Sequence, residues 1–512
     1  MADIRKTILE IDGENLNLEK ISNFLENKYT EIKLSQKAYK KVSDSHSNVI
    51  KILSEKRPVY GINTGFGSFA DVMISSDDTA TLQKNLIFSH AAGTGELFPN
   101  YIVKLIMLFR INALAKGFSG ISHETLGQLI NFLNKDIIPL VPKYGSVGAS
   151  GDLAPLSHIA LCLLGEGEVF YKEKKMKTAE ALKKAGLKKI SLKPKEGLAL
   201  TNGTQMMSAV CAYGCYRFEK LFKTALVSSA MSVEALLGSL TPFSENIHKA
   251  RPHQGQIETA KYMRKILNKS GIVESHKNCS RIQDAYTLRC IPQVYGACLD
   301  TFNYVKKVME IEVNSATDNP LIFDEKTVES GGNFHGEPIA FVIDFLAIAL
   351  SEIGSMSERR IDRMLNHSSN KTLPPFLTKN GGLNSGFMIA QYTAAALVSE
   401  NKILSHPAST DSIPTSANQE DHVSMGSIGA VKLLKTVENV ESVVAIELMC
   451  ACQGVEFHKP LKPSPFLTKV LNSYRKEVKF WEEDRIMYKE IENTKNFING
   501  EKFNNLLEEI WK

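Results

Sequence analysis

The sequence predicts a mainly α protein, in which a mixed N-terminal domain (residues 1–202) precedes an extended bundle of long helices (residues 203–512). Strand and turn signals become few after Asn202, where the chain holds long segments rich in Ala, Leu, Met, Val and Glu. These segments span residues 204–240, 292–313, 337–368, 384–405 and 420–455. Long helices with short loops form a bundle. Helices that are apolar on all sides are usually buried, which suggests burial between subunits.

The N-terminal domain opens with signals for both strand and helix. Ile8 to Ile11 predicts a short strand, closed by a turn. Residues 35–56 show helical periodicity, with Ser35 as the expected N-cap. Pro58 to Thr64 predicts an extended segment that breaks into a Gly-rich loop.

Three further stretches complete the outline. Glu168 to Lys177 predicts a hairpin, and the Lys-rich residues from Lys183 to Lys195 predict a solvated surface stretch. Residues 478–512 are charged and predict helices that decorate the bundle.

Composition excludes several classes of function. The chain has 512 residues, 43% hydrophobic and 23% charged, and its net charge of +5 is too small to indicate nucleic acid or membrane binding. The N-terminus has no apolar core of a signal peptide. The apolar stretch from Ile339 to Leu350 is too short, and is interrupted by Asp344, to span a bilayer. We therefore expect a cytoplasmic protein.

The eight cysteines favour neither disulfides nor metal. Cys211 and Cys215 lie in apolar, helical surroundings, as do Cys450 and Cys452, and no Cys/His quartet has zinc spacing. They are expected to be buried, reduced thiols, and no metal site is predicted.

The most informative stretch runs from Gly145 to Leu153, in the N-terminal domain. Its small residues favour close backbone approach rather than packing. In a tight turn the Gly151 nitrogen can attack the Ala149 carbonyl carbon and close a five-membered ring. Loss of one water from the ring-closed adduct, and of a second water from the Ser150 hydroxyl, leaves a methylidene electrophile. The alternative is a plain Gly-rich turn, whereas a phosphate-binding loop is disfavoured because no Lys or Arg follows nearby.

The segment from Ala149 to Leu156 resembles the cofactor-forming loop of the aromatic amino acid ammonia-lyases. In that family the ring is 4-methylidene-imidazol-5-one (MIO), so the resemblance implies MIO formed from Ala149, Ser150 and Gly151, with no exogenous cofactor. The resemblance extends from Tyr60 to beyond His422 through several separate motifs.

Two motifs supply candidates for proton and carboxylate chemistry. Tyr60 lies at the root of a Gly-rich loop, where a phenolate can act as a base. Tyr286 and Arg289 are three residues apart and share a helical face, and Arg can bind a carboxylate through two hydrogen bonds. An ordinary loop tyrosine and a structural ion pair are the alternatives. The resemblance implies that Tyr60 removes the β-proton, that Arg289 binds the substrate carboxylate, and that Tyr286 and Gln283 assist.

Three further residues are assigned by the resemblance alone. Asn202 reads locally as a turn before a helix, but the matching asparagine of the family contacts the MIO oxygen. Phe334 and Met388 lie in Gly-rich turns and can equally be packing residues; the family pattern makes them walls of the substrate pocket.

The substrate is indicated by His90 and Glu420. Phenylalanine-specific members have an apolar pair near the first position and an amide at the second, whereas the residues here match the histidine-specific pattern. A carboxylate and an imidazole can together pair with both nitrogens of an imidazole substrate.

The resemblance therefore implies conversion of L-histidine to trans-urocanate and ammonia. The residues leave open whether the amine or the ring attacks MIO. The alternative is a tyrosine or phenylalanine ammonia-lyase or aminomutase on the same cofactor. The resemblance also implies a homotetramer whose sites are shared between chains.

Overall fold

The structure is a computed structural model that describes residues 7–55, 58–69, 72–75, 78–277 and 282–511. The chain divides into two compact units. The first comprises Met1–Tyr216, Val305–Asp344 and Pro407–Val431, and the second comprises Arg217–Tyr304, Phe345–His406 and Lys432–Lys512. The expected N-terminal domain, residues 1–202, lies within the first unit, which also includes two segments from later in the chain.

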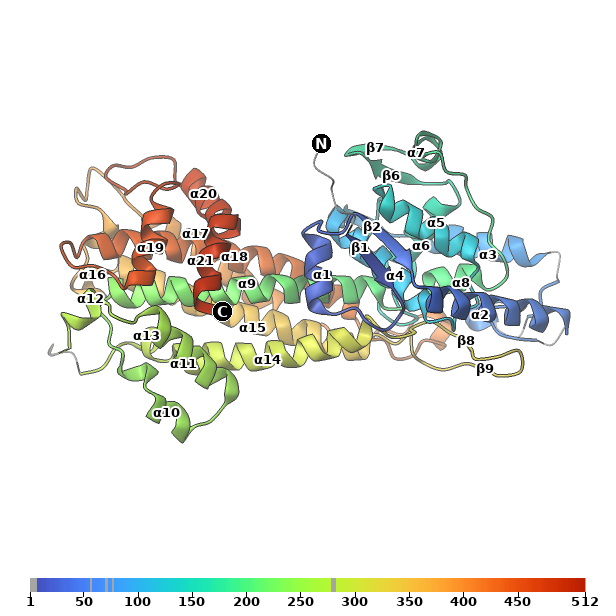
Figure 1. Cartoon of the computed structure of the whole chain (residues 1–512), viewed down its shortest axis with the longest axis horizontal. Helices are drawn as coiled ribbons and strands as arrows, with labels where there is room; N and C mark the ends of the chain where they lie inside the picture. Colours follow the sequence, from blue (N-terminus) through green and yellow to red (C-terminus); the bar gives the residue numbers. More distant parts are fainter. Residues whose placement is uncertain (1–6, 56–57, 70–71, 76–77, 278–281, 512) are drawn as a thin grey trace. The chain divides into compact units, whose positions relative to one another are not determined.

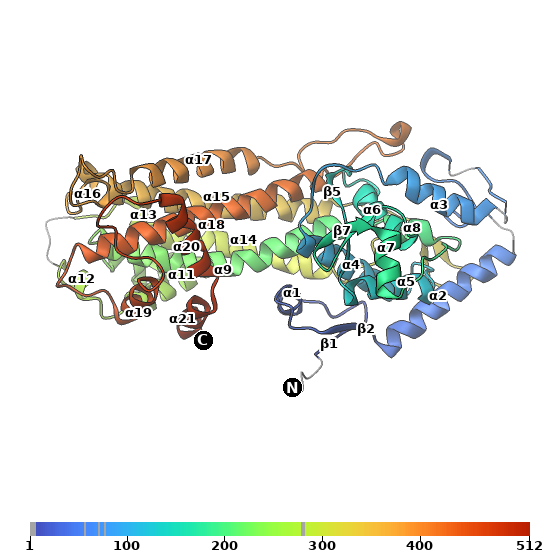
Figure 2. The same cartoon turned by 90° about the horizontal axis from the view of Figure 1, so that it is seen from above.

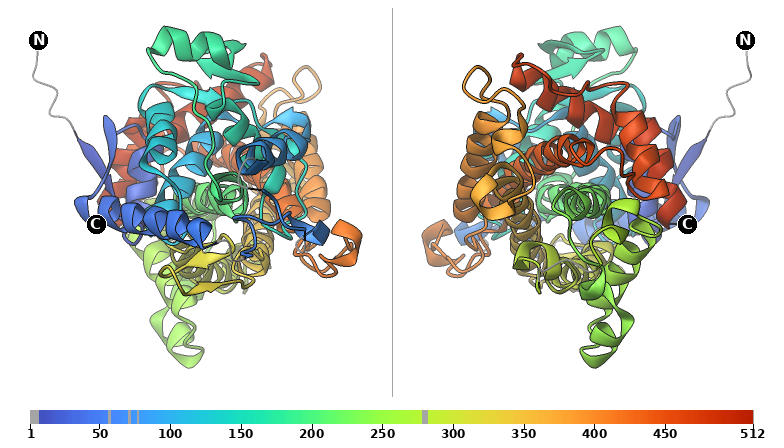
Figure 3. Two further views of the ribbon diagram at one scale, coloured as in Figure 1. Left: turned by 90° about the vertical axis from the view of Figure 1, so that its right-hand side faces the viewer. Right: turned by 90° about the vertical axis from the view of Figure 1, so that its left-hand side faces the viewer.

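Helices predominate among the described residues, which confirms the mainly α prediction (Figures 1 and 3). The helices of the first unit are α1 (Leu18–Leu25), α2 (Gln36–Ser54), α3 (Thr79–His90), α4 (Asn100–Ala115), α5 (His123–Asn134), α6 (Leu153–Leu163), α7 (Thr178–Ala185) and α8 (Glu196–Thr201). The helices of the second unit are α10 (Glu245–Ala250), α11 (Gln254–Ile266), α12 (Gly271–Glu274), α13 (Tyr286–Arg289), α16 (His367–Asn370), α17 (Met388–Leu404), α19 (Pro465–Tyr474), α20 (Met487–Asn499) and α21 (Glu501–Trp511).

The strands form small sheets in the first unit. Their bounds are β1 (Ile8–Ile11), β2 (Glu31–Leu34), β3 (Thr94–Leu97), β4 (Ile137–Pro139), β5 (Pro142–Tyr144), β6 (Glu168–Tyr171), β7 (Lys174–Lys177), β8 (Leu321–Ile322) and β9 (Val328–Glu329). β1 pairs with β2 in parallel, and β4, β6 and β7 form an antiparallel sheet. β3 pairs with β5, and β8 with β9, both antiparallel.

Four long helices contribute residues to both units. They are α9 (Gln205–Ala235), α14 (Ile291–Glu312), α15 (Glu337–Leu365) and α18 (Gly426–Glu456). Together with α17 they confirm the five long helical segments expected from the sequence. The bounds differ in one important place: α18 begins at Gly426, so Glu420 lies in the loop before it and not on the helix.

In the second unit these four helices lie side by side (Figure 2). A buried ion pair joins them. Arg360 of α15 donates to Glu447 of α18 at 2.5 and 2.9 Å, and neither side chain is exposed to solvent. Arg360 also donates to the Tyr295 hydroxyl of α14 at 2.5 Å, and Ser232 of α9 donates to Glu447 at 2.8 Å. Because both charges are fully hydrogen-bonded, the pair is tolerated in the core and links all four helices.

α15 is long and apolar enough to cross a membrane, but 61% of its most apolar 18-residue window is buried within the chain. That degree of burial is typical of the core helix of a soluble protein. The four cysteines singled out from the sequence, Cys211, Cys215, Cys450 and Cys452, are buried and are not joined in disulfides, as expected. Burial raises the pKa of Cys452 to about 12, so this thiol is unreactive.

Several local predictions in the first unit are confirmed. Ile8–Ile11 is a strand, and α2 begins after Ser35, whose side chain accepts from the Ala38 N–H at 3.0 Å. The hairpin of residues 168–177 turns at Lys172 and Glu173, both with positive φ. Positive φ at both central residues matches the right-handed twist of the two strands.

The expected extended segment from Pro58 to Thr64 is wrong. The chain turns there, because the Ile62 and Asn63 N–H groups both donate to the Val59 carbonyl, at 3.1 and 3.2 Å. Gly61 has a φ of +72°, and the Asn63 side chain accepts from the Val59 N–H at 2.8 Å. A glycine in this conformation and a side-chain bond to the backbone favour a turn over a strand.

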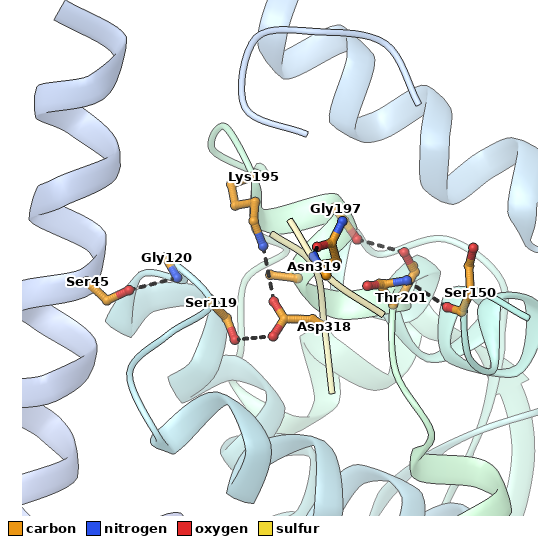
Figure 4. Close-up of polar contacts among 12 residues, drawn as sticks. Ser45, Ser119, Gly120, Ser150, Lys195, Gly197, Thr201, Asp318 and Asn319 are labelled. Carbon is orange, nitrogen blue, oxygen red and sulfur yellow. Dashed lines mark hydrogen bonds and ion pairs between the residues drawn. The ribbon is translucent and has the colours of Figure 1, made fainter. Parts of the chain in front are cut away.

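The stretch from Lys183 to Lys195 is mostly solvated, as expected, but its last residue is not. Lys195 is fully buried and donates to Asp318 at 3.1 Å, while Ser119 donates to the other oxygen of Asp318 at 3.0 Å (Figure 4). The C-terminal helices α20 and α21 likewise form part of the core, because Phe497 and Phe503 are buried. Charge along the sequence concealed the apolar face of these two helices.

Candidate active site

A cavity of about 420 Å3 opens in the first unit. Its wall is built from stretches that are far apart in the sequence. Those stretches supply Tyr60, Gly67, Ala149, Ser150, Leu198, Asn202, Asn319, Ser330, Phe334, His335, Gln419, Glu420, Asp421 and His422. Six residues singled out from the sequence therefore meet in one cavity: Tyr60, Ala149, Ser150, Asn202, Phe334 and Glu420.

The loop of residues 145–151 is held in a conformation that requires glycine. Gly148 and Gly151 have φ values of +67° and +78°. A Cβ on Gly151 would collide with the carbonyl of Gly203, and a Cβ on Gly148 would collide with the Ser424 hydroxyl. The absence of side chains therefore allows the close backbone approach that the sequence suggested.

The segment around the start of α18 clamps this loop. The Ser424 hydroxyl donates to the Gly148 carbonyl at 3.0 Å, and the Met425 N–H donates to the Val147 carbonyl at 2.9 Å. The Ser427 hydroxyl donates to the Ser146 carbonyl at 2.6 Å. Three consecutive carbonyls are thus fixed from one side, which leaves residues 149–151 as the turn between this clamp and α6.

Ser150 is held by two of the residues predicted to work with it. Its hydroxyl donates to Glu420 Oε1 at 2.5 Å, and its carbonyl accepts from Asn202 Nδ2 at 2.7 Å. The second oxygen of Glu420 accepts from the Thr415 hydroxyl at 2.7 Å, so the carboxylate is fixed at both ends. The hydroxyl and the carbonyl of Ser150 are therefore both polarised by a partner in the cavity wall.

Asp152 anchors the loop, and sequence reasoning missed it. Its side chain is fully buried, and one oxygen accepts from the N–H groups of Met206 and Met207 at 2.9 and 3.1 Å. These N–H groups lie in the first turn of α9, where a carboxylate is favoured. The Asp152 N–H donates to the Gly203 carbonyl at 2.6 Å. An Asp between a Gly-rich loop and a helix was the available signal.

Arg110 was also missed, although a single Arg within the apolar run of α4 is an unusual feature. Its fully buried guanidinium donates to the Asn202 carbonyl at 2.7 Å, to Gln205 Oε1 at 2.8 Å and to the Ala199 carbonyl. Burial lowers the pKa of Arg110 to about 10, opposed by the carboxylates of Asp318 and Asp152. Arg110 therefore fixes the backbone of the turn that presents the Asn202 amide to Ser150.

Tyr60 reaches the cavity from the turn described above. Its hydroxyl accepts a long hydrogen bond, 3.3 Å, from the Gly67 N–H. Phe66 packs edge-on against its ring, with the centroids 6.5 Å apart. The phenol is therefore positioned by residues of its own loop.

His90, the last residue of α3, lies outside the described cavity wall. Its Nδ1 lies 2.9 Å from the Ser89 hydroxyl. Burial lowers the pKa of His90, whereas the Leu86 carbonyl and the negative charge of Glu420 oppose that shift. The two residues predicted to select the substrate therefore interact electrostatically, although only Glu420 borders the cavity.

The remaining four predicted residues, Gln283, Tyr286, Arg289 and Met388, belong to the second unit. None of these described residues is part of the cavity wall in the first unit. Gln283 and Arg289 border a separate cavity of about 720 Å3. Tyr286 is 71% exposed, and the Arg289 guanidinium lies over its ring, 4.8 Å from the centroid. The two side chains share a face of α13, as their spacing predicted.

The buried ion pair of the second unit supports this helix. The Thr287 carbonyl accepts from Arg360 at 3.3 Å, and the Thr287 hydroxyl donates to the Met356 carbonyl at 3.2 Å. α13 is only one turn long, so these tertiary bonds stabilise it where its own hydrogen bonds are few.

The family is decided by comparison with known proteins. A family model described as aromatic amino acid lyase matches residues 16–476. The chain belongs to the aromatic amino acid lyase family. Among aromatic amino acid lyases, the histidine ammonia-lyase of Caldanaerobacter subterraneus subsp. tengcongensis is 49% identical over 500 residues, which cover 98% of each chain.

Solved structures of aromatic amino acid lyases and their relatives have the same fold. The crystal structure of histidine ammonia-lyase from Trypanosoma cruzi matches with a TM-score of 0.91 and 41% identity, covering 98% of this chain and 96% of that one. The tyrosine aminomutase of Streptomyces globisporus matches with a TM-score of 0.91 and 36% identity, covering 98% of both chains. The fold is therefore common to members with different substrates.

The buried carboxyl of Asp152 makes stability depend on pH. Burial raises its pKa from 3.8 to about 7, so the folded chain keeps a proton that the unfolded chain has lost. That contribution is lost as pH rises through about 7, and between pH 6 and 8 it amounts to about 1.4 kcal/mol. Asp152→Asn keeps an acceptor for α9 and should remove that share of the pH dependence. Urea unfolding of both proteins at pH 6 and pH 8 tests this. The same change in unfolding free energy between the two pH values in both proteins would contradict it.

Proposed function

We propose that this chain converts L-histidine to trans-urocanate and ammonia, using MIO formed from Ala149, Ser150 and Gly151. The observation that carries the proposal is the convergence of Asn202 and Glu420 on Ser150 at the cavity wall. The level of identity to a histidine ammonia-lyase along nearly the whole chain supports the substrate.

The residues present fit the cofactor. Ring closure would make the Ser150 carbonyl the exocyclic oxygen of MIO, and this is the atom that accepts from Asn202. When formed, MIO supplies an electrophile to which the substrate adds, so that its amine becomes a better leaving group. A donor already placed at the oxygen where charge develops stabilises it without reorganisation. No exogenous cofactor is required by this chemistry.

The Ser150 hydroxyl would leave as water during cofactor formation. That departure releases Glu420 Oε1, which would then face the cavity with no competing donor from Ser150. Glu420, still held through its other oxygen by Thr415, is then available to accept from an imidazole N–H of the substrate. His90 would interact electrostatically with Glu420, and Phe334 would pack against the imidazole ring of the substrate.

The remaining roles follow the family pattern. Tyr60 borders the cavity and would remove the β-proton. Arg289, supported by Gln283 and Tyr286, would bind the substrate carboxylate. Met388 would complete the pocket wall.

None of the described residues Gln283, Tyr286, Arg289 and Met388 is part of the cavity wall, and we propose a D2 homotetramer in which neighbouring chains complete each site. The exposed apolar residues Ile389, Tyr392 and Ile403 lie on one face of α17 and support such an assembly. We further propose that the enzyme is cytoplasmic.

The alternative is a tyrosine or phenylalanine ammonia-lyase or aminomutase on the same cofactor. The structural match to a tyrosine aminomutase is as close in TM-score as the match to a histidine ammonia-lyase. The choice of substrate therefore depends on Glu420 and His90 and not on the fold.

Ser150→Ala tests the cofactor. It removes the leaving hydroxyl and adds no bulk, so the protein should fold and lose nearly all activity. Mass spectrometry of the peptide that contains residue 150 should show the loss of two waters in wild type only. An unmodified peptide in active wild-type enzyme would show that no MIO forms.

Glu420→Gln tests the substrate. The amide keeps the shape of the side chain but replaces a charge-assisted acceptor, so kcat/KM for L-histidine should fall about 10- to 100-fold. His90→Ala should cause a smaller loss. Near-ultraviolet absorbance of MIO serves as the control for cofactor formation. Wild type should prefer L-histidine over L-phenylalanine and L-tyrosine by about 10 000-fold. A preference for either of the latter would instead assign a phenylalanine or tyrosine ammonia-lyase or aminomutase.

Mixing two variants that are each expected to be strongly impaired tests the shared site. Arg289→Lys keeps the charge but loses bidentate geometry, and Ser150→Ala lacks the cofactor. If neighbouring chains supply these residues, co-refolded mixtures should form some sites with both residues intact and recover part of the activity. Each variant refolded alone is the control. Failure of mixed tetramers to recover activity would place both residues in one chain.

A further inference from the structure

Three side chains of the first unit form a cluster at the cavity that the proposed reaction does not use. His335 and His422 border the cavity, and Glu337 is the first residue of α15. One ligand atom from each of the three lies within 4.8 Å of the other two. The sequence concealed this cluster because His422 is distant from the other two residues along the chain.

The local geometry holds the cluster together. His335 Nδ1 accepts from the Glu337 N–H at 3.3 Å, and His335 Nε2 lies 3.2 Å from the His422 carbonyl. The two imidazole rings are 5.7 Å apart and nearly stacked, at an angle of 28°. Both hydrogen bonds of His335 are long, so either nitrogen can be released at small cost.

One oxygen of the Glu337 carboxylate is unpaired. This atom, Oε2, is buried and has no hydrogen-bond partner among the described residues. A buried, unsatisfied carboxylate oxygen beside two imidazoles is a site that a cation would stabilise.

We propose that His335, Glu337 and His422 bind one divalent transition-metal ion of the zinc type at the rim of the cavity. Two imidazoles and one carboxylate match the ligands of open zinc sites, which keep a fourth position for water or a ligand. Magnesium and calcium prefer oxygen ligands and are disfavoured. Because both histidines border the cavity, the fourth position faces it.

Binding requires only a local contraction. Ligand atoms of a tetrahedral zinc ion are about 3.3 Å apart, given bonds of about 2.0 Å, so the ligand atoms must approach one another by up to about 1.5 Å. His422 is exposed and Glu337 and His335 are half-buried, so all three can move without repacking the core. The ion would replace one of the two long hydrogen bonds of His335.

The test uses the full-length protein after removal of metals with a chelator. Titration with Co2+ should produce the visible absorption of a four- or five-coordinate ion at one equivalent per chain, and Zn2+ should displace it. Glu337→Gln and His422→Ala should each weaken Co2+ binding at least about tenfold. This readout is independent of activity, so the assignment stands or fails separately from the proposed reaction.

Two control variants locate the site. His253→Ala removes an exposed histidine of the second unit, and Asp421→Asn removes a carboxylate beside His422 that is not in the cluster. Both should bind Co2+ as wild type does, and thermal unfolding should show that every variant is folded. Absence of the Co2+ spectrum in wild type, or loss of it in either control but not in Glu337→Gln, would overturn the assignment.

Discussion

The candidate site depends on the close approach of two backbone segments at Gly151 and Gly203. These residues form a parallel bridge, and the Asp152 N–H donates to the Gly203 carbonyl at 2.6 Å. Any side chain at position 151 would occupy the space of that carbonyl. The contact places Asn202 beside the Ser150 carbonyl and sets the start of α9, since Asp152 accepts from its first N–H groups. The Ala149–Gly151 loop, the Asn202 amide and the start of α9 are therefore fixed by one contact.

Buried charged side chains support the backbone near the contact between Gly151 and Gly203. Arg110 holds the backbone of Asn202, and Lys195 pairs with Asp318, which precedes the cavity residue Asn319. Each charge is costly to bury and is retained because it has partners with good geometry. The backbone that carries the Asn202 amide is therefore rigid. A donor that stabilises developing charge without reorganising is best supported by buried groups that do not exchange with water.

The sequence predicted the helices, because their signals are local, and six of the fourteen residues of the cavity wall, of which Asn202 and Phe334 came from the family resemblance alone. Ser35 caps α2, and the residues of the Ala149–Gly151 loop carry their chemistry in three consecutive positions. It failed where an interaction joins distant segments. The turn at Pro58 to Thr64, the burial of Lys195 and the role of Asp152 each depend on a partner elsewhere in the fold. Arg289 and Met388 could be named but not placed, since they lie in the other unit.

The loop before α18 brings two kinds of recognition together. Glu420 contacts Ser150, and two residues later the His422 carbonyl meets the ring of His335. The loop is fixed at its base, because the Val423 N–H donates to the Ser412 hydroxyl at 2.9 Å and Thr415 pairs with Glu420 through backbone and side chain. Glu420 and His422, to which the proposals above assign substrate binding and cation binding, therefore lie on one short loop with a fixed base.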